Sequence, residues 1–309
     1  MEVTQIRDLI AVVDAGSIRS AARAQGVTAP VLTRNVRDLE EELGVQLIER
    51  TAHGVLPTAA GKAFLVRSRN VQNELVRMRE ETAQWAGKTG SVVFGVGNQA
   101  FPVIPAALAT FRRRFSNADV RMVGGTSVTL IPQLRESELD FALGGIPPGV
   151  KDKQIRTIPL WINQRVIVGR RGHPLRNAKS LKELAGADWI IRSGSEETPL
   201  GSPVQLIANL FEANGLASPK SVVRCGDSAL HLAILAQSDL LSTMDLPQLN
   251  SATVRNHLRP INLGAIKPPF SGTVYLYQRA DSPLTPLAAA MVAAIKAEAR
   301  KLAFSASAS

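Results

Sequence analysis

The chain has 309 residues, of which 45% are apolar and 20% charged, a composition typical of a soluble globular protein with two or three domains. No run of about 18 apolar residues occurs and the N-terminal segment carries acid, so we expect no membrane span, no signal peptide and a cytoplasmic location. The only cysteine, Cys225, excludes an internal disulfide, and the four histidines lack ligand spacing, so we expect no metal and no cofactor.

The net charge of +10 is unevenly distributed along the chain. Residues 1–88 hold 12 basic and 11 acidic side chains, and the remainder holds 24 and 15. Bulk charge therefore gives no argument for nucleic-acid binding by the N-terminal part. The basic C-terminal part gives only a weak argument for an anionic ligand, since an ordinary solvated surface explains its charge better.

Residues 16–44 are predicted to form two short helices joined by a tight turn. Ser17 is the expected N-cap of the first helix, Gly26 supplies the turn, and Gly44 ends the second helix as a C-cap. Thr28 is the expected N-cap of the second helix and Pro30 lies in its first turn, so this helix begins near Ala29. This arrangement is typical of a helix-turn-helix, whose second helix enters the major groove of DNA.

The second helix separates an apolar face from a polar face. The apolar residues recur at spacings of four, three and four: Leu32, Val36, Leu39 and Leu43. The opposite face can touch a partner and carries Pro30, Arg34 and Arg37. Glutamates at 40–42 crowd the C-terminal end, where we expect them to keep that end away from phosphates. DNA recognition would then depend on the positions of the arginines, and we expect the acidic residues to lie away from them.

Two short strands around a polar turn are predicted at residues 46–50 and 53–58. They would form a wing beside the second helix, with Arg50 and His53 near a phosphate backbone.

A long helix is predicted from Thr58 to about Gly87. Apolar or aromatic residues recur at heptad positions, and we expect them to form a dimerisation face: Phe64, Val71, Leu75, Met78 and Trp85. The alternative is an amphipathic helix packed on its own domain. Residues 87–91 then read as a hinge.

Four segments of this N-terminal part resemble the LysR-type transcriptional regulators. They are GSIRSAA at 16–22, VTAPVLTRNVRDLEEELG at 27–44, QLIER at 46–50 and LPTAAG at 56–61. The resemblance implies a winged helix-turn-helix at residues 1–60, a linker and dimerisation helix at 61–88, and an effector-binding domain at 89–309. It further implies double-stranded DNA as a partner, a homodimer or homotetramer, and contact with RNA polymerase.

The resemblance also assigns the DNA contacts. The expected set is Ser17, Thr28, Ala29, Pro30, Thr33, Arg34, Arg37, Arg50 and His53. The family usually has Gln where this chain has Ala29, so the base contact that this Gln commonly makes is in question here. Two such helices held by the linker helices would read a partly palindromic site.

From Ser91 onward, short apolar runs alternate with helical stretches, which predicts an α/β fold with a parallel sheet and crossover helices. The chain is expected to cross from lobe I to lobe II near residues 162–165 and to return near 264–268. Lobe I then comprises residues 91–161 and 268–304, and lobe II comprises residues 165–264. This two-lobed arrangement resembles periplasmic solute-binding proteins and the effector-binding half of LysR-type regulators.

A ligand is expected beyond the carboxyl ends of the predicted strands, where loops and helix N-termini offer hydrogen-bond donors. This rule selects a set of loop residues in both lobes: Asn98, Gln99, Ala100, Thr126, Ser127, Gly145, Arg192, Ser193, Thr198 and Ser202. Hydroxyls, glycines and Arg192 favour a small anion such as a carboxylate or sulfonate. Each residue taken singly could equally be an ordinary loop cap.

The sequence argues against an enzyme. No complete dinucleotide-binding, nucleophile-elbow, P-loop or zinc-protease motif is present, and we expect no catalytic residues. A solute-binding protein for transport would share the two lobes, but it would need a signal peptide and no helix-turn-helix.

Overall fold

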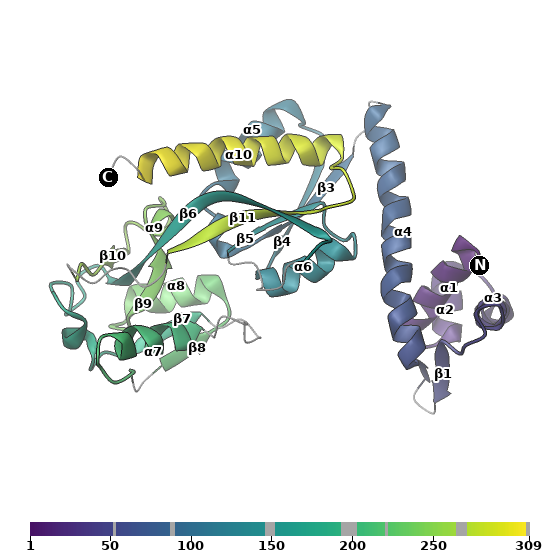
Figure 1. The fold of residues 1–309 in the computed structure, drawn as a ribbon, viewed down its shortest axis with the longest axis horizontal. Helices are drawn as coiled ribbons and strands as arrows, with labels where there is room; N and C mark the ends of the chain where they lie inside the picture. Colours follow the sequence, from purple (N-terminus) through teal and green to yellow (C-terminus); the bar gives the residue numbers. More distant parts are fainter. Residues whose placement is uncertain are drawn as a thin grey trace. The chain divides into compact units, whose positions relative to one another are not determined.

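The structure, a computed structural model, describes residues 1–51, 54–86, 90–145, 152–192, 203–219, 222–263 and 271–306. It divides into two compact units, which we describe separately (Figure 1). The first unit holds residues 1–91 with 132–139, and the second holds residues 92–131 and 140–309. No helix of the described residues is long and apolar enough to cross a membrane.

The first unit is built from helices and a two-stranded hairpin. Its elements are α1 (Val3–Asp14), α2 (Ile18–Gln25), α3 (Ala29–Leu43), β1 (Ile48–Thr51), β2 (Gly54–Pro57) and α4 (Ala59–Trp85). β1 and β2 are antiparallel. The helix pair, the wing and the long helix are thus found where the sequence predicts them.

Capping residues set the helix boundaries of the first unit. Gly26 and Gly44 adopt the left-handed conformation at φ 69° and 67°, which an L side chain disfavours, and each ends its helix. The Ser17 hydroxyl accepts a hydrogen bond from the Ser20 amide at 3.5 Å. Thr28 stands at the predicted N-cap of α3 but makes no side-chain capping bond. The predicted boundaries are confirmed, and one predicted cap bond is absent.

Two glycines let the wing and α4 approach their neighbours closely. A Cβ at Gly54 would lie 2.4 Å from the Gly16 oxygen, and that oxygen accepts a hydrogen bond from the Val55 amide at 2.8 Å. A Cβ at Gly61 would lie 1.9 Å from the Leu47 oxygen. Any side chain at Gly61 would therefore push α4 away from the start of the hairpin.

The second unit is organised around one large sheet. Its strands follow the order β10-β6-β11-β5-β3-β4, and β9 also pairs with β6. They are β3 (Ser91–Val96), β4 (Asp119–Gly124), β5 (Phe141–Gly144), β6 (Ile155–Arg170), β9 (Ser242–Asp245), β10 (Leu258–Pro260) and β11 (Ser271–Arg279). A separate parallel pair consists of β7 (Trp189–Arg192) and β8 (Val222–Cys225).

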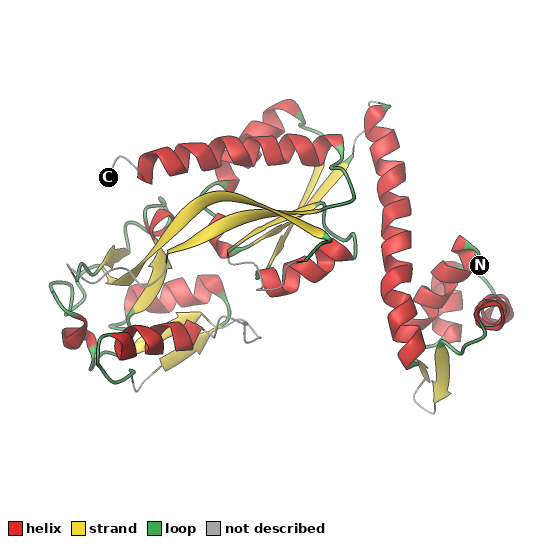
Figure 2. Cartoon of the chain, viewed as in Figure 1, coloured by secondary structure: helices red, strands yellow, loops and turns green. Residues whose placement is uncertain are grey.

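The prediction of a parallel sheet is only partly right. β3 and β5 are parallel, but β11 is antiparallel to both β5 and β6, and β6 is antiparallel to β9 and β10. Figure 2 shows β6 and β11 as long strands lying side by side. These two strands carry the chain between the lobes in opposite directions, and a pattern of alternating strands and helices does not reveal that. The expected return at 264–268 lies outside the described residues.

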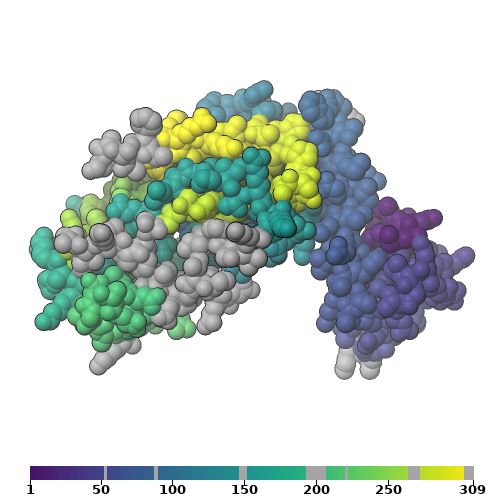
Figure 3. Space-filling view, viewed as in Figure 1, coloured from purple at the N-terminus to yellow at the C-terminus, as the bar shows by residue number. Residues whose placement is uncertain are grey.

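Helices complete the two lobes. They are α5 (Ile104–Arg114), α6 (Ser127–Arg135), α7 (Pro203–Ala213), α8 (Ser228–Gln237), α9 (Leu246–Leu249) and α10 (Pro286–Ala306), with short 3-10 helices η1 (Asn98–Ala100) and η2 (Leu181–Leu184). In lobe I, α5 and α10 pack on each other and share one core with β3, β5 and β11. Figure 3 shows α10 in yellow at the surface of this unit.

Lobe II has cores of its own. One gathers around Trp189 and Phe211, whose rings meet edge to face at 5.9 Å, and another around Leu235 and Met244. The core of lobe I includes Trp161. Trp161 lies on β6, and Ile167 and Val168 of the same strand belong to the two cores of lobe II, so β6 contributes to the cores of both lobes.

Candidate nucleic-acid interface and effector site

The helix α3 packs with one face and exposes the other. Leu32, Val36 and Leu39 are buried in the core of the first unit, as the spacing predicts. Leu43, predicted on the same face, is exposed because it lies at the end of the helix, beyond the packing partners. Arg34 and Arg37 are exposed on the opposite side.

The exposed face of α3 also carries acidic residues. Arg34 Nε lies 3.5 Å from Asp38 Oδ2, and Arg37 Nε lies 3.1 Å from Glu41 Oε1. The prediction that acidic residues would lie away from the arginines is therefore wrong for Asp38 and Glu41. Positions 34, 37, 38 and 41 follow the spacing of a single helix face, which the excess of glutamates at the C-terminal end obscured.

Glu40 has a structural role that the sequence did not reveal. Its carboxylate accepts hydrogen bonds from the amides of Leu47 and Ile48 at 2.7 and 3.0 Å. The side chain therefore ties the end of α3 to the start of the wing.

The other expected DNA contacts occupy the starts of helices and the wing. Thr28 and Pro30 are exposed at the start of α3, and Arg50 is exposed on β1. Ser17, Ala29 and Thr33 are half-buried. His53 lies outside the described residues.

A buried contact between α1 and α3 was not predicted. Asp8 is 1% exposed, and its Oδ2 accepts a hydrogen bond from Asn35 Nδ2 at 2.6 Å. Asn35 stands next to Arg34 on α3. The contact therefore fixes how α3 is rotated about its own axis, and with it the direction of the arginines.

The predicted dimerisation stripe on α4 is only partly available. Val71, Met78 and Trp85 are exposed, Trp85 by 76%, and Leu75 is half-buried. Phe64 packs against the core of its own unit, in line with the alternative interpretation of this helix. Of the predicted stripe, Val71, Met78 and Trp85 are therefore exposed to a partner.

Three loops meet at one end of the sheet in lobe I. The Gly97 amide donates to the Leu143 oxygen at 2.7 Å, and the Gly125 amide donates to the Val96 oxygen at 3.3 Å. A Cβ at Gly145 would lie 3.0 Å from Gln99 Nε2. The structure therefore brings together the predicted loops that follow β3, β4 and β5.

Individual loop residues differ in what they offer a ligand. Asn98, Gln99, Ser127 and Gly145 are half-buried, and Thr126 is exposed. Ala100 is fully buried in the core of lobe I, and its amide donates to the Gly97 oxygen at 2.9 Å. Ala100 therefore offers neither its side chain nor its amide to a ligand. Ser193, Thr198 and Ser202 lie outside the described residues.

Lobe II contains a polar cluster around Arg192, the last residue of β7. Arg192 is half-buried, and its Nε is buried without a hydrogen-bond partner. Burial, and next the charge of Arg165, lower the pKa of the Arg192 guanidinium. Arg165 itself pairs with the buried Asp245 at 3.2 Å. Within the described part of the chain, Arg192 thus forms no ion pair, whereas its neighbour Arg165 does.

His231 is a second member of this cluster. It is 3% exposed, and its Nε2 lies 3.1 Å from Ser242 Oγ. Burial, followed by the charge of Arg192, lowers the pKa of His231 to about 4, so the ring is neutral at physiological pH. Sequence reasoning missed Arg165, His231 and Asp245 because they lie far apart in the chain and belong to no motif.

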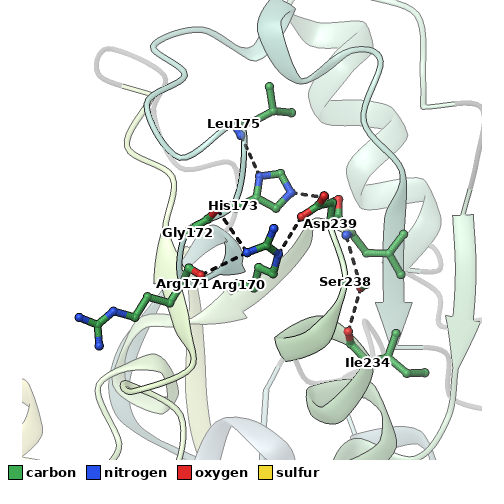
Figure 4. Close-up of polar contacts among 9 residues, drawn as sticks. Arg170, Arg171, Gly172, His173, Leu175, Ile234, Ser238 and Asp239 are labelled. Carbon is green, nitrogen blue, oxygen red and sulfur yellow. Dashed lines mark hydrogen bonds and ion pairs between the residues drawn. The ribbon is translucent and has the colours of Figure 1, made fainter.

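A set of polar contacts fixes the turn between α8 and β9 (Figure 4). Arg170 Nε donates to Asp239 Oδ1 at 2.7 Å. His173 Nδ1 accepts from the Leu175 amide at 3.0 Å, so its Nε2 carries the proton and donates to the Asp239 oxygen at 2.9 Å. These contacts hold β9 in register with β6, which sets Asp245 opposite Arg165 and Ser242 opposite Val168.

No group of three or more histidine, cysteine, aspartate or glutamate side chains among the described residues could hold a metal ion. Cys225 is buried at the end of β8, and its thiol contacts the Asp227 oxygen at 3.3 Å.

Comparison with known proteins identifies both parts of the chain. Residues 3–62 match the family described as bacterial regulatory helix-turn-helix protein, lysR family, and residues 86–300 match the LysR substrate binding domain. The HTH-type transcriptional regulator CbbR of Sinorhizobium medicae (strain WSM419) is 28% identical over 81% of this chain and 81% of its own length. The regulator GalR of Pseudomonas putida is 30% identical over 90% of this chain and 69% of its own.

A solved structure shares the fold over nearly the whole chain. The crystal structure of full-length CbnR complexed with its target DNA has a TM-score of 0.68 at 20% identity, covering 96% of this chain and 100% of that one. This family consists of transcriptional regulators and not of enzymes. The chain belongs to the LysR family of bacterial transcriptional regulators, with an N-terminal helix-turn-helix and a C-terminal effector-binding domain.

Proposed function

We propose that this regulator reads promoter DNA with α3 and responds to a small carboxylate or sulfonate bound in the second unit. The DNA part is supported by the exposed face of α3, opposite the apolar face on which Leu32, Val36 and Leu39 are packed. The effector part is supported above all by one observation, the half-buried Arg192 whose Nε is buried without a hydrogen-bond partner.

In this proposal, the start of α3 faces the bases and the wing holds the backbone. Arg34 and Arg37 contact bases or phosphates, Pro30 lies against a thymine methyl, and Arg50 contacts phosphate. Thr28, Ala29, Thr33, Ser17 and His53 complete the interface. Hydrogen-bonded base readout by a side chain at position 29 is not part of it, because alanine has no polar atom to offer.

A homodimer or homotetramer in the cytoplasm is the proposed assembly, with RNA polymerase as the eventual partner. The exposed side chains of Val71, Met78 and Trp85 on α4 support a helix–helix contact between copies, because large apolar side chains gain from burial. Replacing Leu75 by Asp would place a charge in that contact. We expect the full-length variant to dissociate in light scattering, and an unchanged mass would assign the dimer contact to another surface.

The effector would change the regulator only if it bound one conformation more tightly than another. An anion at Arg192 would replace the water that this guanidinium has lost, which makes the site more favourable for a charged ligand than for a neutral one. The loops after β3, β4 and β5 would supply uncharged hydrogen-bond donors to the rest of the effector.

The first experiment is a gel shift of the full-length protein on the DNA upstream of its own gene, with excess competitor. We expect a discrete shift that resists competition, and its absence with folded protein would contradict recognition of that site. Carboxylates and sulfonates would then be titrated while Trp161 and Trp189 fluorescence is followed. A matched panel of neutral amides is the control, and no response to any anion would remove the effector proposal while leaving DNA binding intact.

A further inference from the structure

We infer that Asp38 and Glu41 are specificity-determining residues of the DNA interface, because they compete with phosphate for Arg34 and Arg37. The inference rests on the proposed contact of these two arginines with DNA. It goes further by assigning a role to two acidic residues in what is otherwise a surface for a polyanion.

The placement of the four side chains carries the argument. Residues 34, 37, 38 and 41 stand at i, i+3, i+4 and i+7 of α3, so they share the exposed face of the helix. Each acidic residue lies four positions after an arginine, and both pairs are formed, at 3.5 Å and 3.1 Å. In the free protein, both arginines of this face are therefore already paired with a carboxylate.

Exposure makes these pairs weak enough to exchange. The side chains are 79% and 37% exposed in the first pair and 67% and 66% in the second. Pairs this exposed contribute roughly 0.2–1 kcal/mol, so a stronger partner displaces the carboxylate readily.

Phosphate and guanine differ in how well they compete with a carboxylate. A phosphate is an anion, so it is repelled by the carboxylate beside the arginine and must displace that carboxylate to use the guanidinium fully. A guanine is neutral and accepts two hydrogen bonds from one arginine, and because both pairs are made through Nε, the terminal nitrogens can bind the base while the carboxylate stays in place. Asp38 and Glu41 therefore disfavour DNA that offers only phosphates more than DNA that offers the correct bases.

Glu42 provides a matched control on the same helix. It has the same charge and stands next to Glu41, but its carboxylate pairs with the N-terminal amine and with neither arginine. Replacing Glu42 by Gln changes the charge of α3 by the same amount and leaves the two arginine pairs in place.

The test measures full-length wild type, Asp38→Asn, Glu41→Gln and Glu42→Gln on two duplexes. One duplex is selected by the wild-type protein from a random library, and the other has the same composition in scrambled order. Fluorescence anisotropy at several salt concentrations gives the affinities, and circular dichroism checks that each variant is folded.

We expect Asp38→Asn and Glu41→Gln each to bind the scrambled duplex roughly twofold to fivefold more tightly, with a smaller gain on the selected one. The slope of log affinity against log salt on the scrambled duplex should steepen by up to about one for each arginine released. Glu42→Gln should leave the ratio of the two affinities unchanged.

Equal gains on both duplexes, or the same loss of ratio in Glu42→Gln, would overturn the inference, because net charge alone would explain them. Failure of the wild-type protein to select any duplex would overturn the proposed DNA readout and this inference together. The two kinds of failure are therefore distinguishable.

Discussion

Helix α3 and the effector-binding domain use arginine in opposite ways. Arg34 and Arg37 are exposed, and each is paired with a carboxylate on its own helix. Arg192 is half-buried, its Nε has no hydrogen-bond partner, and its pKa is lowered mainly by burial. Arg34 and Arg37 are solvated and their pairs can exchange. Arg192 has lost water and forms no ion pair among the described residues, although Asp245 and Asp227 act on it as nearby charges.

This difference matches the two ligands that we propose. Every DNA sequence offers phosphates, so a surface that binds one sequence selectively gains when carboxylates compete with phosphate for its arginines. A small effector is scarce and must compete with water, so a partly desolvated guanidinium strengthens its electrostatic attraction. Paired, solvated arginines thus suit a DNA surface, and a partly desolvated arginine suits a site for a scarce small ligand.

The largest expected effect comes from removing the exposed arginine that we place nearest the bases. Arg34→Ala should lose on the order of 1–3 kcal/mol of binding to a selected duplex and less on a scrambled one. Anisotropy on both duplexes measures the difference. Equal losses would mean that Arg34 contacts only phosphate.

A change at Arg192 should act in the opposite sense on stability. Arg192→Met removes a partly desolvated charge and should stabilise the anion-free protein by about 1 kcal/mol, while abolishing any response to carboxylates or sulfonates. Thermal unfolding in buffers with and without these anions measures both effects. The control is Arg224→Met, since Arg224 is exposed on β8. A lower melting temperature for Arg192→Met would show that Arg192 already has a partner.

Acidification should affect the effector domain through His231. Its pKa is lowered to about 4 by burial and by Arg192, whereas the unfolded chain binds the proton near 6.5. Stability from the neutral ring is therefore full above pH 6.5 and is lost as pH falls toward 4. We expect His231→Gln to lose less stability than wild type between pH 6.5 and 4.5 in urea unfolding. Parallel curves would exclude His231 as the titrating group.

The smallest expected effect separates charge from geometry on α3. Arg37→Lys keeps the positive charge and can still pair with Glu41, so binding to scrambled DNA should change less than about twofold. A much larger loss on a selected duplex would place Arg37 at a base, where its planar fork matters.

The local features of the first unit could be predicted from the sequence because their causes are local. Gly26 and Gly44 end helices through their own backbone conformation, and the spacing of Leu32, Val36 and Leu39 defines a face within one helix. The Arg34–Asp38 pair is also local, since residues four apart lie on one face of a helix, and this spacing could have predicted it.

The effector domain was predictable in its elements and not in its pairings. The strands and helices follow the expected order, yet β6 pairs with three strands distant in sequence. The cluster of Arg165, Arg192 and His231 forms only when those pairings exist, so no motif could reveal it. Ala100 was predicted to contact the effector because it follows the end of a strand, but it is buried in the core of lobe I.

The place of β11 in the sheet has a consequence for synthesis of the protein. β11 lies between β5 and β6, although it comes after all of lobe II in the chain. The ribosome therefore releases β5 and β6 long before β11, and until then the edge that each will pair with β11 has no partner strand. Domains generally fold in the order in which they emerge, so the helix-turn-helix is complete while lobe I is still open. A nascent chain stalled before residue 271 would carry a folded helix-turn-helix and an incompletely folded effector-binding domain.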